Sequence, residues 1–226
     1  MTQDIALPDR LKGRPTYKGM IVPYFVAWFL NGQQCNEARE GAQPSFPVTD
    51  YARLITSRKQ NRCWICGHML GTYKAFVFGP GSALARASYE PPSHRDCARY
   101  AVQVCPYLTN PDHQHMTEKG YTPKPGEQVL PDVEPHNPGM AVIWVCRKYG
   151  VEVRDASRGI FNFVPEQFEW VEFWTCGRRA TYKEVADAIQ RSIHVNNMLD
   201  AGNNRELAWR VQDLLRHVED AHGGVT

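Results

Sequence analysis

The sequence predicts an α+β fold, and three features of the 226-residue chain lead to this prediction. Paired cysteine and histidine residues between positions 63 and 97 have the spacing of a metal-binding module. Four short apolar runs between positions 141 and 174 are typical of strands. Two segments after position 181 have the apolar periodicity of helices. We therefore expect three parts: an N-terminal strand region with a metal-binding module (1–105), a proline-rich linker or long loop (106–139), and an antiparallel sheet with C-terminal helices (140–226).

The composition is that of an ordinary folded protein. Hydrophobic residues make up 42% of the chain and charged residues 22%, which excludes a disordered protein and a coiled coil. Seven cysteines, an odd number in a chain of this size, indicate reduced thiols rather than a disulfide framework. We therefore expect a cytoplasmic protein.

The first element is one or two core strands within residues 12–30. This segment mixes glycine and proline with an apolar, aromatic run that ends at the turn dipeptide Asn31-Gly32. Residues 20–30 follow several basic residues and could imitate a secretory signal. Pro23 interrupts them, no small-x-small cleavage site follows, and a bilayer span needs ~20 residues. We expect a buried strand here rather than a targeting or membrane-surface segment.

A short basic helix is expected next, at residues 51–60. Asp50 can cap its first turn, and Leu54 and Ile55 can face inward. This helix brings the chain to the first cysteine of the metal-binding motif, Cys63.

The motif consists of Cys63-Trp64-Ile65-Cys66-Gly67 and, further along, His94-Arg95-Asp96-Cys97. A Cys-x-x-Cys-Gly turn brings two thiolates together, and the glycine can take the positive φ that lets the chain leave the turn. The prolines and serine at 91–93 stop the preceding segment, and Ser93 can cap a helix. His94 and Cys97 then lie one turn apart, ~5–6 Å at Cβ. The spacing predicts one tetrahedral Zn²⁺ bound by Cys63, Cys66, His94 and Cys97.

Between the two ligand pairs, residues 72–78 and 82–89 are expected to form two strands around a turn at 79–81. The Cys-x-x-Cys-Gly turn, the expected hairpin and the ligand-bearing helix together resemble a treble-clef zinc finger over residues 63–105. The predicted fold is thus a treble-clef-like zinc module plus a small antiparallel sheet and two C-terminal helices. Four protein ligands make a closed shell, which indicates a structural zinc, because a catalytic zinc keeps a position for water.

Two further residues compete for a place in the metal shell. Cys105 lies ~12 Å along a continuous helix from Cys97, too far to share the ion, and is better explained as a buried small side chain. His68 could replace His94, although it is crowded so close to Cys66.

The second half of the chain begins with a segment rich in proline. Residues 106–139 hold seven of the sixteen prolines and almost no apolar periodicity, which favours a linker or a long loop. Beyond it, turn signals separate the strand-like runs, and alternation is clearest at 170–174. We expect one small antiparallel sheet, with the strands 141–147, 151–154, 160–164 and 168–174.

Two helices complete the chain. Thr181 and Glu184 have the spacing of a capping box, which places a helix start after Thr181. The apolar positions of this helix are Val185, Ala186, Ile189 and Ile193. A last helix follows Asn203-Asn204 and carries a single apolar stripe that must pack against the rest of the protein. The stripe is formed by Leu207, Val211, Leu214, Leu215 and Val218.

Positive charge is concentrated around the metal motif. Residues 51–105 hold eight basic residues against two acidic ones, a local charge of +6, while the whole chain has a net charge of only +2. A basic block of this kind indicates an acidic partner, either nucleic acid or an acidic protein surface. The candidate partner-binding residues are Arg53, Arg58, Lys59, Arg62, Arg86, Arg95 and Arg99.

Six blocks within about residues 10–195 are considered together: 22–28, 63–67, 76–80, 90–98, 105–108 and 177–181. Together they resemble a family of small uncharacterised proteins from phages and bacterial genomes. The resemblance implies a phage or prophage accessory or host-interaction protein in the cytoplasm of a bacterial host. It implies no catalytic activity and no catalytic residue.

The alternative is a metal-dependent enzyme that acts on nucleic acid or nucleotides. A His-Asn-His nuclease also builds on a treble-clef-like scaffold, but residues 74–90 contain neither the histidine nor the asparagine that its chemistry needs. His113 and His115 lack a third ligand, and Cys176 lacks a nearby base, so a buried or inert thiol is favoured there. Trp170, Phe173 and Trp174 fit a core better than a base-stacking surface, because they alternate as strand residues do.

Overall fold

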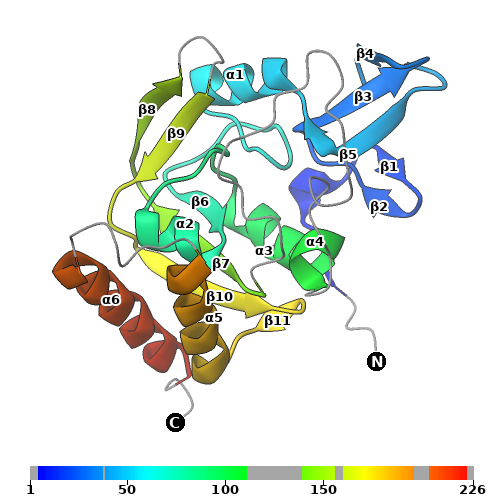
Figure 1. Ribbon diagram of the computed structural model, residues 1–226. Helices are drawn as coiled ribbons and strands as arrows, with labels where there is room; N and C mark the ends of the chain where they lie inside the picture. Colours follow the sequence, from blue (N-terminus) through cyan, green and yellow to red (C-terminus); the bar gives the residue numbers. More distant parts are fainter. Residues whose placement is uncertain (1–4, 38, 111–138, 156–159, 196–203, 223–226) are drawn as a thin grey trace.

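The computed structural model describes residues 5–37, 39–110, 139–155, 160–195 and 204–222 (Figure 1). It mixes helices with antiparallel sheets, which confirms the α+β class. The strands are β1 (Thr16–Tyr17), β2 (Met20–Ile21), β3 (Val26–Leu30), β4 (Gln33–Cys35), β5 (Gln43–Thr49), β6 (Lys74–Phe78), β7 (Ala141–Cys146), β8 (Tyr149–Asp155), β9 (Ile160–Pro165), β10 (Trp170–Thr175) and β11 (Arg178–Arg179). The helices are η1 (Asp9–Leu11, a 3-10 helix), α1 (Tyr51–Gln60), α2 (Pro80–Ala85), α3 (Arg95–Val104), α4 (Pro106–Thr109), α5 (Tyr182–Val195) and α6 (Asn204–His222).

A four-stranded antiparallel sheet in the order β11-β10-β7-β6 forms the centre of the protein. Every residue of β7 is buried, as expected for an uninterrupted apolar strand that is covered on both faces. The register places Phe76 of β6 opposite Trp144 of β7, and Ile143 of β7 opposite Glu172 of β10. A carboxylate in the middle of this sheet needs positively charged partners, and α3 supplies such partners.

Two hydrophobic cores lie on the two faces of this sheet. Alternate residues of β7 point to opposite faces, so Trp144 belongs to one core and Ile143 to the other. On the first face, Trp144 packs with residues of α2, α5 and α6. On the second face, Ile143 packs with Ala98 and Val102 of α3. The resulting order is α3, sheet, then the helices α2, α5 and α6, and it fixes α3 against the sheet.

Both C-terminal helices are confirmed. The Thr181 amide donates to Glu184 Oε2 (2.8 Å) and the Glu184 amide donates to Thr181 Oγ1 (3.4 Å), which is the reciprocal pattern of a capping box. The predicted stripe of α6 packs on the first core, with Leu214 and Val218 fully buried. Helix α5 contributes Val185, Ile189 and Ile193 as expected, but Ala188 rather than Ala186 lies in the core.

Strands β3, β4 and β5 form a separate three-stranded sheet in the order β4-β3-β5, at the opposite end of the molecule from α5 and α6 (Figure 1), and β1 and β2 pair with each other. Strand β3 is the predicted buried strand, and Asn31 and Gly32 at φ 51° and 79° form the predicted turn to β4. Within the described residues, none of the helices is long and apolar enough to cross a membrane.

Two predictions about the strands are wrong. Residues 82–89 do not pair with β6 as a hairpin, because residues 80–85 form helix α2, which Pro80 begins at its first position. The four later strands do not form one sheet, since β8 and β9 form a two-stranded sheet of their own and β7 and β10 join β6. Outside that pair, Phe163 of β9 forms an isolated antiparallel bridge with Ser88. Strand β6 lies before the proline-rich segment and β7 lies after it, yet the two strands pair with each other. The parts of the chain before and after that segment therefore share one sheet. Most of that segment, residues 111–138, lies outside the described residues.

Candidate metal centre

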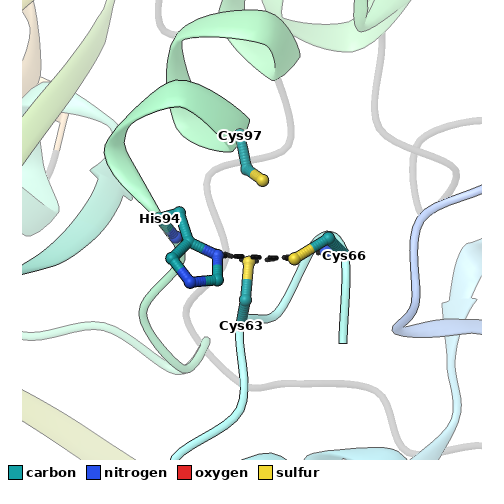
Figure 2. A group of neighbouring side chains, drawn as sticks. All are labelled: Cys63, Cys66, His94 and Cys97. Atoms are coloured by element: carbon teal, nitrogen blue, oxygen red, sulfur yellow. Dashed lines mark hydrogen bonds between the residues drawn. The ribbon is translucent and has the colours of Figure 1, made fainter. Parts of the chain in front are cut away.

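Four buried side chains, Cys63, Cys66, His94 and Cys97, point toward one another between the turn after α1 and the start of α3 (Figure 2). Each offers one ligand atom, and the four atoms all lie within 4.8 Å of one another. Cys66 Sγ and His94 Nδ1 are 3.4 Å apart. Ligands held by one zinc at ~2.0–2.3 Å have separations close to these, so the four residues fit a single tetrahedral ion.

The turn at residues 63–68 holds the first two ligands. The Cys63 amide donates to the His68 carbonyl (2.8 Å) and the Gly67 amide donates to the Cys63 carbonyl (2.9 Å). The amides of Cys66 and His94 both point at Cys63 Sγ, each at 3.4 Å. These N–H···S contacts stabilise negative charge on the sulfur, as a metal-bound thiolate needs.

Gly67 is required at this turn for two reasons, and its replacement tests them. Its φ is +81°, as predicted, and an added Cβ would lie 2.7 Å from Cδ2 of the Tyr24 ring. We expect Gly67→Ala to lower the free energy of unfolding of the metal-loaded protein by about 2–3 kcal/mol, measured by denaturant titration. Gly71→Ala is the matched control, because a Cβ at Gly71 meets nothing within 4 Å. Equal stability losses in the two variants would show that the turn tolerates a side chain.

His94 is oriented by contacts on both sides of its ring. Its Nε2 lies 3.0 Å from the Met69 carbonyl oxygen, which can only accept, so Nε2 carries the proton and Nδ1 is left for the metal. The backbone of Ser93 pairs with that of Ala75 in β6, which fixes the approach to α3. The predicted cap at Ser93 is wrong: His94 itself is the N-cap and makes no side-chain capping hydrogen bond. Its ring is turned to the thiols instead.

Without a metal, the close approach of these groups shifts the pKa values of three of them. Burial disfavours the Cys63 thiolate, but hydrogen bonds from Cys66, Cys97 and His94 outweigh it and hold the pKa of Cys63 well below its usual value. Burial also disfavours a charged imidazole, yet hydrogen bonds with Cys63 and Cys66 raise the pKa of His94 to about 10. The same two partners raise the pKa of the Cys97 thiol above its usual value. A metal ion must therefore displace protons from His94 and Cys97 when it binds.

The two competing ligands lie outside the cluster. His68 is exposed, and its backbone carbonyl, not its ring, takes part in the turn. Cys105 lies at the end of α3, as helix geometry predicted, but it is half-buried rather than buried. Cys63, Cys66, His94 and Cys97 therefore make a complete set of four protein donors.

Most of the predicted basic residues have contacts of their own within the protein. Arg53 lies against Tyr24 and pairs with Glu37 and Asp50. Arg58 lies over the Phe161 ring, and Arg86 lies between the rings of Trp144 and Trp209. Arg62 donates to the Gly67 carbonyl, and Lys59 is exposed on α1. Of the seven candidates, the structure brings only Arg95 and Arg99 to a common partner.

That partner is Glu172, which the sequence did not single out, and a third arginine from outside the basic block joins it. The Glu172 carboxylate lies 2.6 Å from Arg95, 2.7 Å from Arg99 and 3.1 Å from Arg179. Burial alone would raise the pKa of Glu172, but hydrogen bonds from Arg99 and Arg95 and the charge of Arg179 hold it below its usual value. One sequence signal could have identified Glu172. It lies two residues from both Trp170 and Trp174, so in a strand all three side chains point to the same face.

The weaker candidates have mixed outcomes. Phe173 is a core residue as predicted and Trp174 is partly buried, but Trp170 is 38% exposed. Cys176 is exposed rather than buried. His113 and His115 lie outside the described residues.

Comparison with known protein families, with curated proteins and with solved structures finds no match to this chain.

Proposed function

We propose that this protein is a zinc-stabilised binding protein that engages nucleic acid through a basic surface next to its metal centre. The observation that carries the proposal is the closed set of four buried donors, Cys63, Cys66, His94 and Cys97, within 4.8 Å of one another. Four protein ligands leave a tetrahedral ion no position for water or substrate, which favours a structural role over a catalytic one.

The donor set supports zinc as the metal. Three thiolates and one imidazole suit Zn²⁺, a borderline-soft ion that has no geometric preference of its own and takes tetrahedral sites. When bound, the ion would join the turn at 63–68 to the first turn of α3. These segments are far apart in sequence, and the ion would add a fixed link to the two small apolar clusters that α3 joins. Zinc would therefore fix α3 and the arginines that extend from it.

Charge near the centre supports nucleic acid as the partner. Arg95 and Arg99 lie on α3 directly after His94, and their side chains remain 36% and 42% exposed. Together with Arg179 they outnumber the one carboxylate that they share, so positive charge remains at the surface. Arginine is the residue best suited to phosphate, because its fork of N–H groups matches two phosphate oxygens.

Two measurements test the proposed function. Elemental analysis of protein purified under reducing conditions should find about one zinc per chain, and X-ray absorption should find sulfur and nitrogen ligands with no oxygen. Binding of a labelled mixed-sequence oligonucleotide should weaken steeply as salt rises, because phosphate contacts release counterions. An oxygen ligand on the metal would favour the alternative, a metal-dependent enzyme acting on nucleic acid or nucleotides. No binding even at low salt would remove nucleic acid as the partner.

We also propose the cytoplasm of a bacterial host as the compartment, and a phage or prophage accessory or host-interaction role. The support for the role is the resemblance of the sequence blocks alone. Support for a reducing compartment is the thiolate-rich centre, which oxidation would destroy.

A further inference from the structure

Arginine and aromatic side chains alternate along the face of the central sheet that α3 covers. Trp170, Glu172 and Trp174 share this face, since alternate residues of a strand point to the same side. The guanidinium carbon of Arg95 lies 5.0 Å from the centre of the Trp170 ring, and that of Arg179 lies 5.1 Å from the centre of a Trp174 ring. We call the following set the α3–β10 row: Tyr73, Arg95, Arg99, Trp170, Trp174 and Arg179.

The arginines of this row carry more charge than their shared partner needs. The Glu172 side chain is only 1% exposed, whereas those of Arg95, Arg99 and Arg179 are 36%, 42% and 43% exposed. One carboxylate neutralises one guanidinium, so two positive charges remain, and they lie on the solvent side of a buried anchor. Because the anchor already holds the three side chains in place, a ligand would pay little of the entropy of ordering them.

The aromatic end of the row is open to solvent. Trp170 and Tyr73 are 38% and 39% exposed, and their ring centres lie 4.6 Å apart in an edge-to-face arrangement. Arg147 lies over the Tyr73 ring at 5.2 Å and pairs with Glu169. Trp170 and Tyr73 are thus held by each other and by Arg95 and Arg147, and each keeps more than a third of its surface open to a ligand.

We propose that the α3–β10 row binds single-stranded nucleic acid, with backbone phosphates at Arg95, Arg99 and Arg179 and a base against Trp170 and Tyr73. The inference rests on the proposed function and adds the site and the form of the ligand. A single strand presents phosphates and free base faces side by side, which is the alternation found in this row. A duplex keeps its base faces stacked inside, where the rings cannot reach them. The carboxylates of an acidic protein segment match the arginines but offer no flat group to stack on the exposed rings.

Fluorescence anisotropy with a labelled oligothymidylate of about 15 nucleotides tests the site. Arg179→Gln leaves Glu172 with two arginine partners, so the fold should persist. We expect this variant to bind at least about 5-fold more weakly and to lower the salt slope by about 0.7, the contribution of one phosphate contact. Trp170→Ala should weaken binding at least about 5-fold, as loss of a base-stacking residue does.

Matched controls lie on α6, on the other side of the sheet. Arg216→Gln removes an arginine that is 65% exposed, and Trp209→Ala removes a tryptophan that is 47% exposed. Both should bind as the native protein does. All variants are compared at one zinc per chain and with unchanged unfolding midpoints, so that a loss of fold is not mistaken for a loss of contact.

The possible results separate this inference from the proposed function. If the native protein binds no oligonucleotide at low salt, the proposed function fails and the inference fails with it. If it binds, but the α3–β10 variants bind as tightly as the α6 variants, the proposed function stands and the site is elsewhere. Tighter binding to a duplex of the same length would overturn the single strand as the ligand. Binding of polyglutamate, but not of the oligonucleotide, through Arg179 would identify an acidic protein as the partner.

Discussion

Replacing Cys97 with alanine should remove the bound metal and strongly destabilise the fold that depends on it. Structural zinc contributes ~10–16 kcal/mol of apparent binding free energy in small zinc domains, as much as or more than the whole stability of an ordinary domain. With three donors left, the site binds zinc far more weakly, and α3 loses its link to the turn at 63–68. We expect a loss of at least about 4 kcal/mol in the free energy of unfolding, measured by denaturant titration alongside zinc content.

The control for this variant is Cys105→Ala. Cys105 lies at the end of the same helix, half-buried and outside the metal cluster, so its replacement removes a thiol without removing a ligand. It should keep one zinc per chain and lose at most about 1 kcal/mol. A strong chelator added to the native protein should reproduce the Cys97→Ala result. Retention of a full equivalent of zinc by Cys97→Ala would refute the assigned ligand set.

Acid should release the metal as well. His94 and the thiolates must lose protons to bind zinc, so protons and metal compete for the same atoms, and the affinity for zinc falls as the pH is lowered. The experiment is a zinc titration against a coloured competitor at several pH values. An affinity independent of pH would contradict a thiolate-rich site.

Replacing Glu172 with glutamine should also destabilise the protein strongly. Glutamine keeps the shape but removes the only negative charge shared by Arg95, Arg99 and Arg179, which leaves three guanidinium groups close together. Loss of one partner from a buried ion pair costs ~3–5 kcal/mol, and the partial exposure of these arginines reduces the cost. We expect a loss of about 2–3 kcal/mol in the free energy of unfolding at neutral pH.

Glu169→Gln is the matched control for this change. Glu169 pairs with Arg147 at the surface, with a side chain 38% exposed, and such pairs contribute ~0–1 kcal/mol. The cost of Glu172→Gln should also shrink with acid. The pKa of Glu172 in the folded protein lies below its ordinary value of 4.5, so its ion pairs stabilise the protein above that pH and lose this effect as the pH falls through the folded-state pKa. Equal costs for the two variants would mean that Glu172 is not an anchor.

The metal centre and Glu172 act on the same helix. His94 and Cys97 would hold the first turn of α3 to the metal, while Arg95 and Arg99 hold the same stretch to β10 through Glu172. A single short helix and its N-cap thus provide two of the four ligands and two of the three arginines. This is why loss of zinc should also weaken nucleic-acid binding, although no metal ligand belongs to the α3–β10 row.

Local patterns were sufficient for the elements whose signals are contained within a few residues. The capping box at Thr181 and Glu184 predicted the start of α5, and the glycine after Cys66 predicted a positive φ. The turn at Asn31-Gly32 and the strand character of β7 to β10 were predicted for the same reason: turn chemistry and apolar alternation are properties of neighbouring residues. The hairpin expected at 82–89 failed because its apolar residues fit a short helix equally well, and Pro80 favours the helix.

The sequence by itself determined the α+β class, the two C-terminal helices and the four candidate ligands, because spacing along the chain limits which side chains can meet at a turn or on one face of a helix. Only the tertiary structure decided that β6 pairs with β7, that two of the seven basic candidates share Glu172, and that Arg179 joins Arg95 and Arg99 there. Contacts between residues more than 70 positions apart depend on which strands pair and how the helices pack on them, and no short sequence pattern indicates these pairings.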